Sequence, residues 1–236
     1  MQSAPRYAVY FVPSRQSALY RYGSSVLGYD CYSGNMVDFP PGFAAAAPDW
    51  RKLTAEPRRY GFHATLKAPF ALLPPYTEEE LIDAVHKFAG RGPARCTFIP
   101  AIRALGSFCA IIADQRQPSI DALAASCTTE FDVYRAPMSA QERARRTASG
   151  LSQSQTRNLD RWGYPYVLSD FRFHMTLTGK IASERREAVL ALLQARFDQV
   201  GLGRSIAIDR LVVVRQDSPS SAFRVISHSR LIAENG

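Results

Sequence analysis

The sequence contains few of the residues that build metal centres or disulfide frameworks. Only four cysteines and four histidines occur among its 236 residues, and no two cysteines form a C-x-x-C pair. A chain of this length needs no disulfide staples, so free thiols are the simpler expectation. A metal site built on so few scattered histidines is disfavoured, and we predict neither a metal ion nor a cofactor.

Long hydrophobic runs are also absent. No apolar stretch approaches the roughly 20 residues that span a bilayer. Residues 1–13 lack the basic start and the long apolar core of a signal peptide. These absences predict a cytoplasmic location and no contact with a membrane.

What the sequence does contain is an ordinary globular composition with a basic excess. Hydrophobic residues make up 46% and charged residues 21%, which suits the core of one domain or of two joined lobes. Lys and Arg number 29 against 21 Asp and Glu, a formal charge of +8. That excess favours anionic ligands such as phosphates, nucleotides or RNA, although net charge by itself identifies no partner.

Periodicity and turn signals divide the chain into strands and helices. Strand-like segments are expected at 7–12, 60–70, 97–105, 108–113, 166–181, 204–215 and 222–232. Helices are expected at 18–27, 118–131 and 183–200. A further helix is expected from Thr77 to Gly90, where Thr77 and Glu80 form a capping box.

The strongest structural clue is an internal repeat. The segment YGFHATLK, residues 60–67, resembles RFHMTLT, residues 172–178, and the histidines at positions 63 and 174 are 111 residues apart. Each motif is followed by a helix and two strands, so a strand–helix–strand–strand unit is duplicated. We expect lobes at about 7–133 and 166–233, between which strands can exchange.

An Arg-rich segment at 136–162 lies between the two lobes. Capping boxes at Ser139 with Glu142 and at Ser152 with Gln155 predict that this insert forms two short helices rather than a disordered linker.

Alternation along the two motif strands separates a core face from a polar face. Side chains on a strand alternate between faces with a period of two. In the first motif His63, Thr65 and Lys67 share the polar face. In the second motif that face carries Arg172, His174, Thr176 and Thr178. If a pseudo-two-fold axis relates the halves, the two His-x-Thr rows meet across one cleft.

Paired His-x-Thr rows suit the cleavage of a phosphate ester. An in-line displacement at phosphorus needs a base on the entering oxygen and an acid on the leaving oxygen, and imidazole serves either role near neutral pH. The hydroxyls of Thr65 and Thr176 can donate to the non-bridging oxygens. Lys67 and Arg172 can add positive charge. The motifs leave open which histidine is the acid and which is the base.

Longer strings around both motifs carry a family resemblance. The strings RRYGFHATLKAPF (58–70), RWGYPY (161–166) and FRFHMTLTG (171–179) resemble the 2H phosphoesterase superfamily, which is named for two His-x-Thr/Ser-x motifs. They resemble more closely an uncharacterised bacterial family often encoded in phosphonate-utilisation operons. The similarity spans nearly the whole chain, and both motifs are intact.

This resemblance implies a bilobal α+β fold of two pseudo-two-fold-related lobes, with antiparallel sheets facing a central cleft. It implies a hydrolase, a metal-independent cyclic phosphodiesterase acting on a small phosphorylated ribose or nucleotide. His63, His174, Thr65 and Thr176 would be catalytic. The substrate-binding residues would be Lys67, Arg172, Thr178 and Tyr60. The operon association points to phosphonate metabolism and to 5-phosphoribosyl 1,2-cyclic phosphate.

Several alternatives stay open. The chain can be a non-catalytic nucleotide- or RNA-binding module, and ligation or cyclisation would use the same groups in reverse. RNA binding would use the arginines of the insert: Arg143, Arg145, Arg146, Arg157 and Arg161. We favour a solvated pair of helices there, because a basic cluster implies nucleic acid only within a suitable fold. His86 and His228 are expected at structural or surface positions, and no obligate protein partner is evident.

Overall fold

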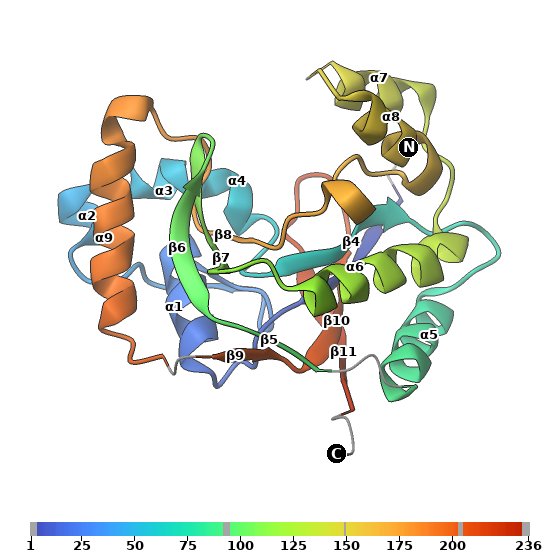
Figure 1. The fold of residues 1–236 in the computed structure, drawn as a ribbon, viewed down its shortest axis with the longest axis horizontal. Coiled ribbons are helices and arrows are strands. Elements are labelled where there is room, and N and C mark those ends of the chain that lie inside the picture. Colours follow the sequence, from blue (N-terminus) through green and yellow to red (C-terminus); the bar gives the residue numbers. More distant parts are fainter. Residues whose placement is uncertain (1–3, 92–94, 149, 203–204, 233–236) are drawn as a thin grey trace.

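Antiparallel pairing joins seven strands into one sheet in the computed structural model of the chain, which describes residues 4–91, 95–148, 150–202 and 205–232. The strands lie side by side in the order β11 (Arg224–Arg230), β10 (Arg210–Gln216), β1 (Arg6–Phe11), β4 (Ala64–Ala71), β8 (Met175–Thr176), β7 (Phe108–Ala113) and β6 (Pro100–Leu105). With the surrounding helices, this sheet confirms the expected α+β class with antiparallel pairing (Figure 1).

The two motif strands meet at a narrow seam in the middle of this sheet. β4 and β8 are joined at a single register pair, Ala64 with Met175. On the far side of the seam β8 pairs with β7 at two positions. Since His63 and His174 immediately precede the paired residues, this seam brings the two motifs next to each other.

Strands of the two repeats are exchanged across the seam. The hairpin that follows the first motif, β6 and β7, extends the sheet beside β8, whereas β10 and β11, which follow the second motif, lie on the β1–β4 side. Helix α5 (Glu78–Gly90) packs against β10 and β11, and α9 (Arg186–Asp198) packs against β6. Each motif helix therefore covers the hairpin of the other repeat.

Short strands and helices complete the fold. Two small sheets pair β2 (Tyr29–Asp30) with β3 (Asn35–Met36) and β5 (Cys96–Phe98) with β9 (Ile206–Ile208). The remaining α-helices are α1 (Ala18–Leu27), α2 (Phe43–Ala46), α3 (Trp50–Leu53), α4 (Ala55–Arg58), α6 (Pro118–Glu130), α7 (Ala140–Thr147) and α8 (Gln153–Trp162). The 3-10 turns are η1 (Phe131–Tyr134), η2 (Leu168–Asp170) and η3 (Ser183–Arg185).

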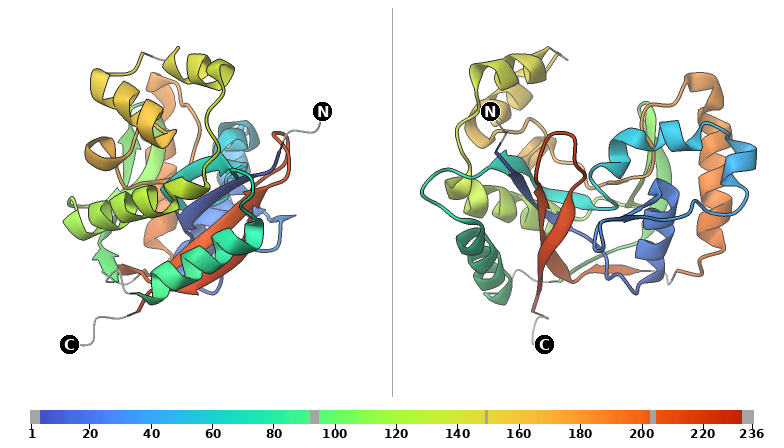
Figure 2. Two further views of the ribbon diagram at one scale, coloured as in Figure 1. Left: turned by 90° about the vertical axis from the view of Figure 1, so that its right-hand side faces the viewer. Right: turned by 180° about the vertical axis from the view of Figure 1, so that it is seen from behind.

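The insert and the last long helix stand at opposite ends of the molecule. Figure 1 and the rear view in Figure 2 place α7 and α8 at one end and α9 at the other, with β4 and β8 between them. The hydroxyls of Ser139 and Ser152 cap α7 and α8. They accept hydrogen bonds from the backbone N–H groups of Glu142 and Gln155. Helix α6 runs beside β4, on which it packs.

A continuous apolar core fills the space between the sheet and the helices. Its fully buried members include Tyr10, Trp50 and Phe62. The ring of Phe62 lies directly on Gly23 of α1, where a Cβ would overlap it. The helix therefore comes close to the backbone that carries His63. All four cysteines are buried.

Most predicted elements are present, but the strands around the motifs are shorter than expected. The capping box of Thr77 and Glu80 is present, and the helices at 18–27 and 118–131 are confirmed within a residue. The strand predicted at 60–70 begins only at Ala64, because Gly61 has a φ of +71° that turns the chain. The strand-like segment at 166–181 is largely wrong, since only Met175 and Thr176 pair there.

Breaks in backbone pairing explain the other differences. Leu168 has a positive φ inside a 3-10 turn, which is incompatible with an extended strand. The strand predicted at 97–105 divides into β5 and β6. The strand predicted at 204–215 divides into β9 and β10. Residue 204 of that strand and residue 233 of the second predicted lobe lie outside the described residues. Helix 183–200 opens as the turn η3.

None of the helices in the described part of the chain combines the length and the apolar content that crossing a membrane requires.

Candidate functional site

A cleft of about 670 Å³ lies over the seam between β4 and β8 and contains both motif histidines. Six of the eight residues predicted for the site line it: Tyr60, His63, Thr65, His174, Thr176 and Thr178. One wall comes from the insert and the segment after it, and the other from α4 and the turn between β6 and β7. The repeat therefore brings its two His-x-Thr rows to one cavity.

His63 is held by its backbone and by an aromatic ring beneath it. Its Nδ1 donates to the carbonyl of Gly61 at 2.9 Å, because a carbonyl oxygen only accepts. In the neutral ring Nε2 then carries the lone pair, and the hydroxyl of Thr65 donates to it at 3.2 Å. The imidazole stacks on the fully buried Tyr10, with ring centroids 3.8 Å apart.

His174 repeats the same backbone arrangement. Its Nδ1 donates to the carbonyl of Arg172 at 2.7 Å, again two residues earlier in the chain. Its ring is tilted against that of Phe108, with 5.9 Å between the centroids. Both histidines therefore use Nδ1 for orientation, and Nε2 is the nitrogen left for chemistry in each motif.

The two imidazoles differ in their electrostatic surroundings. Burial lowers the pKa of His63 to about 4, against a partial opposing effect of the bond to Gly61, and positive charge on His174 lowers it further. His63 is therefore neutral at pH 7 and suited to accept a proton. Among the residues that the structure describes, none stacks on His174 as Tyr10 stacks on His63.

Both motif threonines line the cleft. Thr65 and Thr176 are each half-buried and sit two residues after their histidines. A hydroxyl in this position can turn toward an anion beside the ring, because it both donates and accepts.

The structure does not bring Lys67 to the cleft. Its Nζ is buried and donates to Asp132 at 2.7 Å and to the carbonyl of Thr128 at 2.9 Å. Burial lowers the pKa of Lys67, while Asp132 raises it. The end of α6 and the turn η1 cover this part of the β4 face. Strand alternation therefore predicted the face of β4 that carries Lys67, but it could not show that other elements cover that position.

The other three predicted binding residues, Thr178, Arg172 and Tyr60, differ in burial and in the cavity that they line. Thr178 is fully buried, and its hydroxyl accepts from the backbone N–H of Cys109 at 2.9 Å. Arg172 is exposed and lines a neighbouring cavity instead. Tyr60 does line the cleft, where it stacks on Phe223 with centroids 5.5 Å apart. His86 and His228 are both exposed, on α5 and on the edge strand β11.

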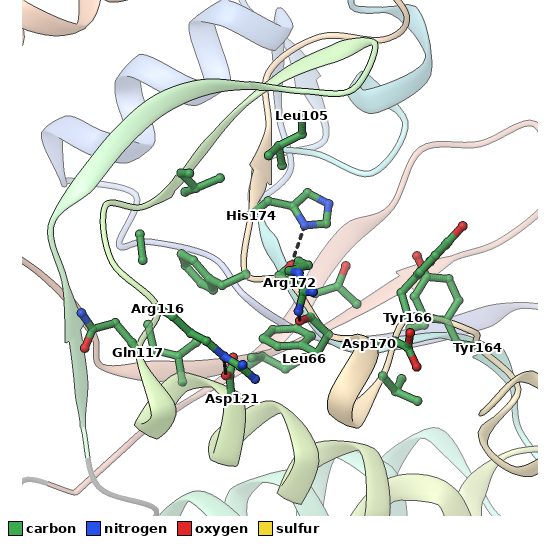
Figure 3. Close-up of a pocket in the computed structure, with 18 of the residues that line it drawn as sticks. Leu66, Leu105, Arg116, Gln117, Asp121, Tyr164, Tyr166, Asp170, Arg172 and His174 are labelled. Carbon is green, nitrogen blue, oxygen red and sulfur yellow. Dashed lines mark hydrogen bonds and ion pairs between the residues drawn. The ribbon is translucent and has the colours of Figure 1, made fainter. Parts of the chain in front are cut away.

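A second cavity of about 820 Å³ adjoins the first and shares Thr65 and His174 with it. Figure 3 shows His174 and Arg172 on one side of this cavity, Tyr164, Tyr166 and Asp170 on another, and Arg116, Gln117 and Asp121 near the start of α6. Much of its lining is apolar, including Leu66, Ile112, Ile120, Phe171 and Phe173. Sequence reasoning missed it, because its walls come from segments far apart in the chain.

Cationic side chains dominate the charged lining of the first cleft. Four of them contribute: Arg6, Arg145, Arg146 and Lys180. Among the described residues that line the cleft, Glu56 alone carries a carboxylate. Arg6 and Lys180 were not singled out by the motifs, and nothing in their local sequence marks them.

The fold and the site define an α+β protein with two backbone-oriented histidines in a cation-lined cleft. A family profile described as "Protein of unknown function (DUF1045)" matches residues 65–224, and the chain belongs to this family. That match confirms the resemblance to an uncharacterised family. Within the described ranges, no group of three His, Cys, Asp or Glu side chains is arranged to hold a metal ion.

Two curated relatives carry the name ribose 1,5-bisphosphate phosphokinase PhnN. The protein from Janthinobacterium sp. (strain Marseille) is 36% identical over 227 residues, which cover 94% of this chain and 50% of the relative. The protein from Laribacter hongkongensis (strain HLHK9) is 34% identical over 194 residues, or 82% of this chain and 44% of the relative. The chain thus spans about half the length of the curated relatives it matches.

Solved structures of related shape include E. coli LigT complexed with 3'-AMP, at a TM-score of 0.44 and 14% identity over 97% of this chain and 99% of that one. Another is a structure described as a phosphoesterase, at a TM-score of 0.41 and 14% identity over 98% of this chain and 99% of that one. At such scores the likeness is remote, and it supports no statement about chemistry.

Replacing Gly61 with alanine is expected to disturb His63 through its carbonyl anchor. Gly61 has a φ of +71°, and a Cβ there would lie 2.7 Å from Cβ of Cys31. We expect Gly61→Ala to lower the free energy of unfolding by about 1–3 kcal/mol and to change the ring-nitrogen NMR shifts of His63. Gly42→Ala, with a φ of +84° and no atom within 4 Å, should cost about 1 kcal/mol and leave those shifts unchanged. An unaltered tautomer in Gly61→Ala would contradict the anchoring role.

Burial of neutral His63 is expected to make the fold acid-sensitive. The pKa falls from an ordinary 6.5 to about 4, so the unfolded chain binds more protons than the fold between these values. The contribution of His63 to stability is therefore complete above pH 6.5 and is lost as the pH falls to 4. We expect a loss of about 2 kcal/mol in the free energy of unfolding, because the ring is only half-buried and solvent weakens the effect. Urea unfolding across this range should show a flatter pH dependence for His63→Gln than for the unaltered protein. Parallel curves would show that His63 is not the group responsible.

Proposed function

We propose that this chain is a phosphodiesterase of the 2H type that opens the cyclic phosphate of a ribose or nucleotide-type substrate without a metal ion. The observation that carries the proposal is the pair of His-x-Thr motifs at one cleft, each histidine oriented through Nδ1 by the carbonyl two residues before it. The resemblance of the surrounding strings adds a role in phosphonate catabolism.

In this proposal the two histidines take different parts of one displacement. His63, held neutral by burial, removes a proton from water through Nε2 as the water oxygen attacks phosphorus. The bond from phosphorus to one ring oxygen breaks, and His174 transfers a proton from its Nε2 to that oxygen. The product is a phosphate monoester and a free hydroxyl. Thr65 and Thr176 donate to the non-bridging oxygens, where negative charge grows in the transition state.

The names of the curated relatives raise a kinase as another reading. Those names describe whole proteins of which this chain matches about half. The sequence contains no G-x-x-x-x-G-K-[ST] segment, which in nucleotide-dependent phosphotransferases cradles the phosphates of the nucleotide. We therefore assign phosphate-ester hydrolysis, and not phosphoryl transfer, to this chain.

A second candidate is nucleotide binding without turnover. The apolar and aromatic cavity beside His174 favours it, because a planar base buries well against such walls. The same histidines would then serve only to hold the phosphate.

Substitution of either histidine is expected to remove catalysis and to spare the fold. In the presence of a chelator, His63→Asn and His174→Asn should each lower kcat on ribose or nucleoside cyclic phosphates by roughly 10²–10⁴-fold, since each removes one proton-transfer group. His228→Asn, on the exposed edge strand, is the matched control and should keep full activity. Circular dichroism of each variant checks the fold.

Three results would overturn this assignment. Activity that disappears with chelator and returns with a divalent ion would indicate a metal mechanism. Undiminished turnover in either histidine variant would remove the acid–base pair. Tight binding of cyclic nucleotides with no turnover by the unaltered protein would favour the binding module.

A further inference from the structure

Two cations face the histidine cleft from opposite walls. Arg145 belongs to α7 of the insert, and Lys180 follows β8, next to the turn between β6 and β7. The backbone N–H of Ile181 donates to the carbonyl of Ser107 at 2.7 Å, which fixes the chain beside Lys180 to that turn. In Figure 1 the insert and the β6–β7 hairpin stand on either side of the seam, in agreement with these two walls.

Neither Arg145 nor Lys180 has a hydrogen-bond or ion-pair partner among the described residues, and both are exposed. Neighbouring cations differ in this respect. Arg146 donates to the carbonyl of Gly163 at 2.7 Å and to Glu142 at 2.6 Å. Arg6 is held by Gln216. The charges of Arg145 and Lys180 are thus left for a ligand.

The helix that carries Arg145 is held in place by ion pairs. Arg143 on α7 pairs with Asp160 on α8 through two bonds of 2.7 and 3.0 Å. Arg161 at the end of α8 lies 3.3 Å from Asp132, the acid that also holds Lys67 of β4. A chain of contacts therefore runs from the motif strand to the insert, so Arg145 is presented from a supported helix.

We propose that Arg145 and Lys180 bind a second phosphate group of the substrate, apart from the phosphate between the histidines. This inference rests on the proposed function and names its substrate class: a sugar cyclic phosphate that also carries a phosphate monoester. A monoester dianion suits two cations from opposite walls, and charge-assisted bonds to phosphate are among the stronger polar contacts. A cleft of about 670 Å³ is of a size for such a small molecule.

The chemistry also places the reaction in a sequence. For a ribose 1,2-cyclic phosphate with a 5-phosphate, water adds to phosphorus, the bond to the 2-oxygen breaks, and His174 protonates that oxygen. The product is ribose 1,5-bisphosphate, the compound in the name of the two curated relatives. A phosphokinase acting on ribose 1,5-bisphosphate would then consume the product of this chain.

The test compares ribose 1,2-cyclic phosphate with and without a 5-phosphate. We expect the unaltered protein to favour the 5-phosphorylated substrate in kcat/KM by about 10–100-fold, which corresponds to charge-assisted bonds of roughly 1.5–3 kcal/mol. Arg145→Gln and Lys180→Gln should each reduce that ratio about 10-fold, mainly through KM. Arg157→Gln, exposed on α8 of the same insert and not among the residues that line the cleft, is the matched control and should keep the full ratio.

The outcomes separate this inference from the proposed function. Histidine-dependent turnover of both substrates with equal kcat/KM, or a ratio unchanged in Arg145→Gln and Lys180→Gln, would overturn the second phosphate site and leave the phosphodiesterase standing. No turnover of any cyclic phosphate would overturn both. Faster turnover of an oligoribonucleotide with a 2',3'-cyclic end, falling steeply with added salt, would replace the small substrate with RNA.

Discussion

The single backbone pairing between Ala64 and Met175 is the contact on which the site depends. It lies directly after both histidines, so its register decides where the two imidazoles stand. Because side chains alternate along a strand, a slip of one residue would turn either ring into the apolar core. The exchange of hairpins between the repeats supports this register, since each half of the sheet contains strands from both repeats.

Matching positions of the two repeats have similar surroundings in some cases and different ones in others. The residue four after each histidine, Lys67 or Thr178, is buried and bonded to the surrounding protein. The residue two after each histidine is a threonine that lines the cleft. The histidines share a carbonyl anchor but differ in their neighbours, because only His63 stacks on Tyr10. The two imidazoles therefore stand in different surroundings, although their motifs are alike.

The insert is attached to the motif strand through one partly buried carboxylate. Asp132 of η1 accepts from Lys67 of β4, from Arg135 just after η1 and from Arg161 of α8, so three cations from separate segments share this carboxylate. Such a group is retained only where its bonds are satisfied, because an isolated buried charge is costly. The same network holds the insert where it forms one wall of the cleft, and it keeps the Lys67 ammonium away from that cleft.

The sequence by itself determined the repeat, the capped helices and the pairing of the four motif residues, because these follow from local periodicity and matched spacing, and the family resemblance of its strings implied the α+β class. It misplaced the strand ends at 60–63 and 166–174, where a positive φ at Gly61 and Leu168 interrupts pairing. Only the tertiary structure decided that Lys67 is buried away from the cleft and that Arg145 and Lys180 line the cleft from opposite walls. It also decided that a second cavity adjoins His174. The physical reason is that these features join residues distant in sequence, and their burial depends on which elements pack over them.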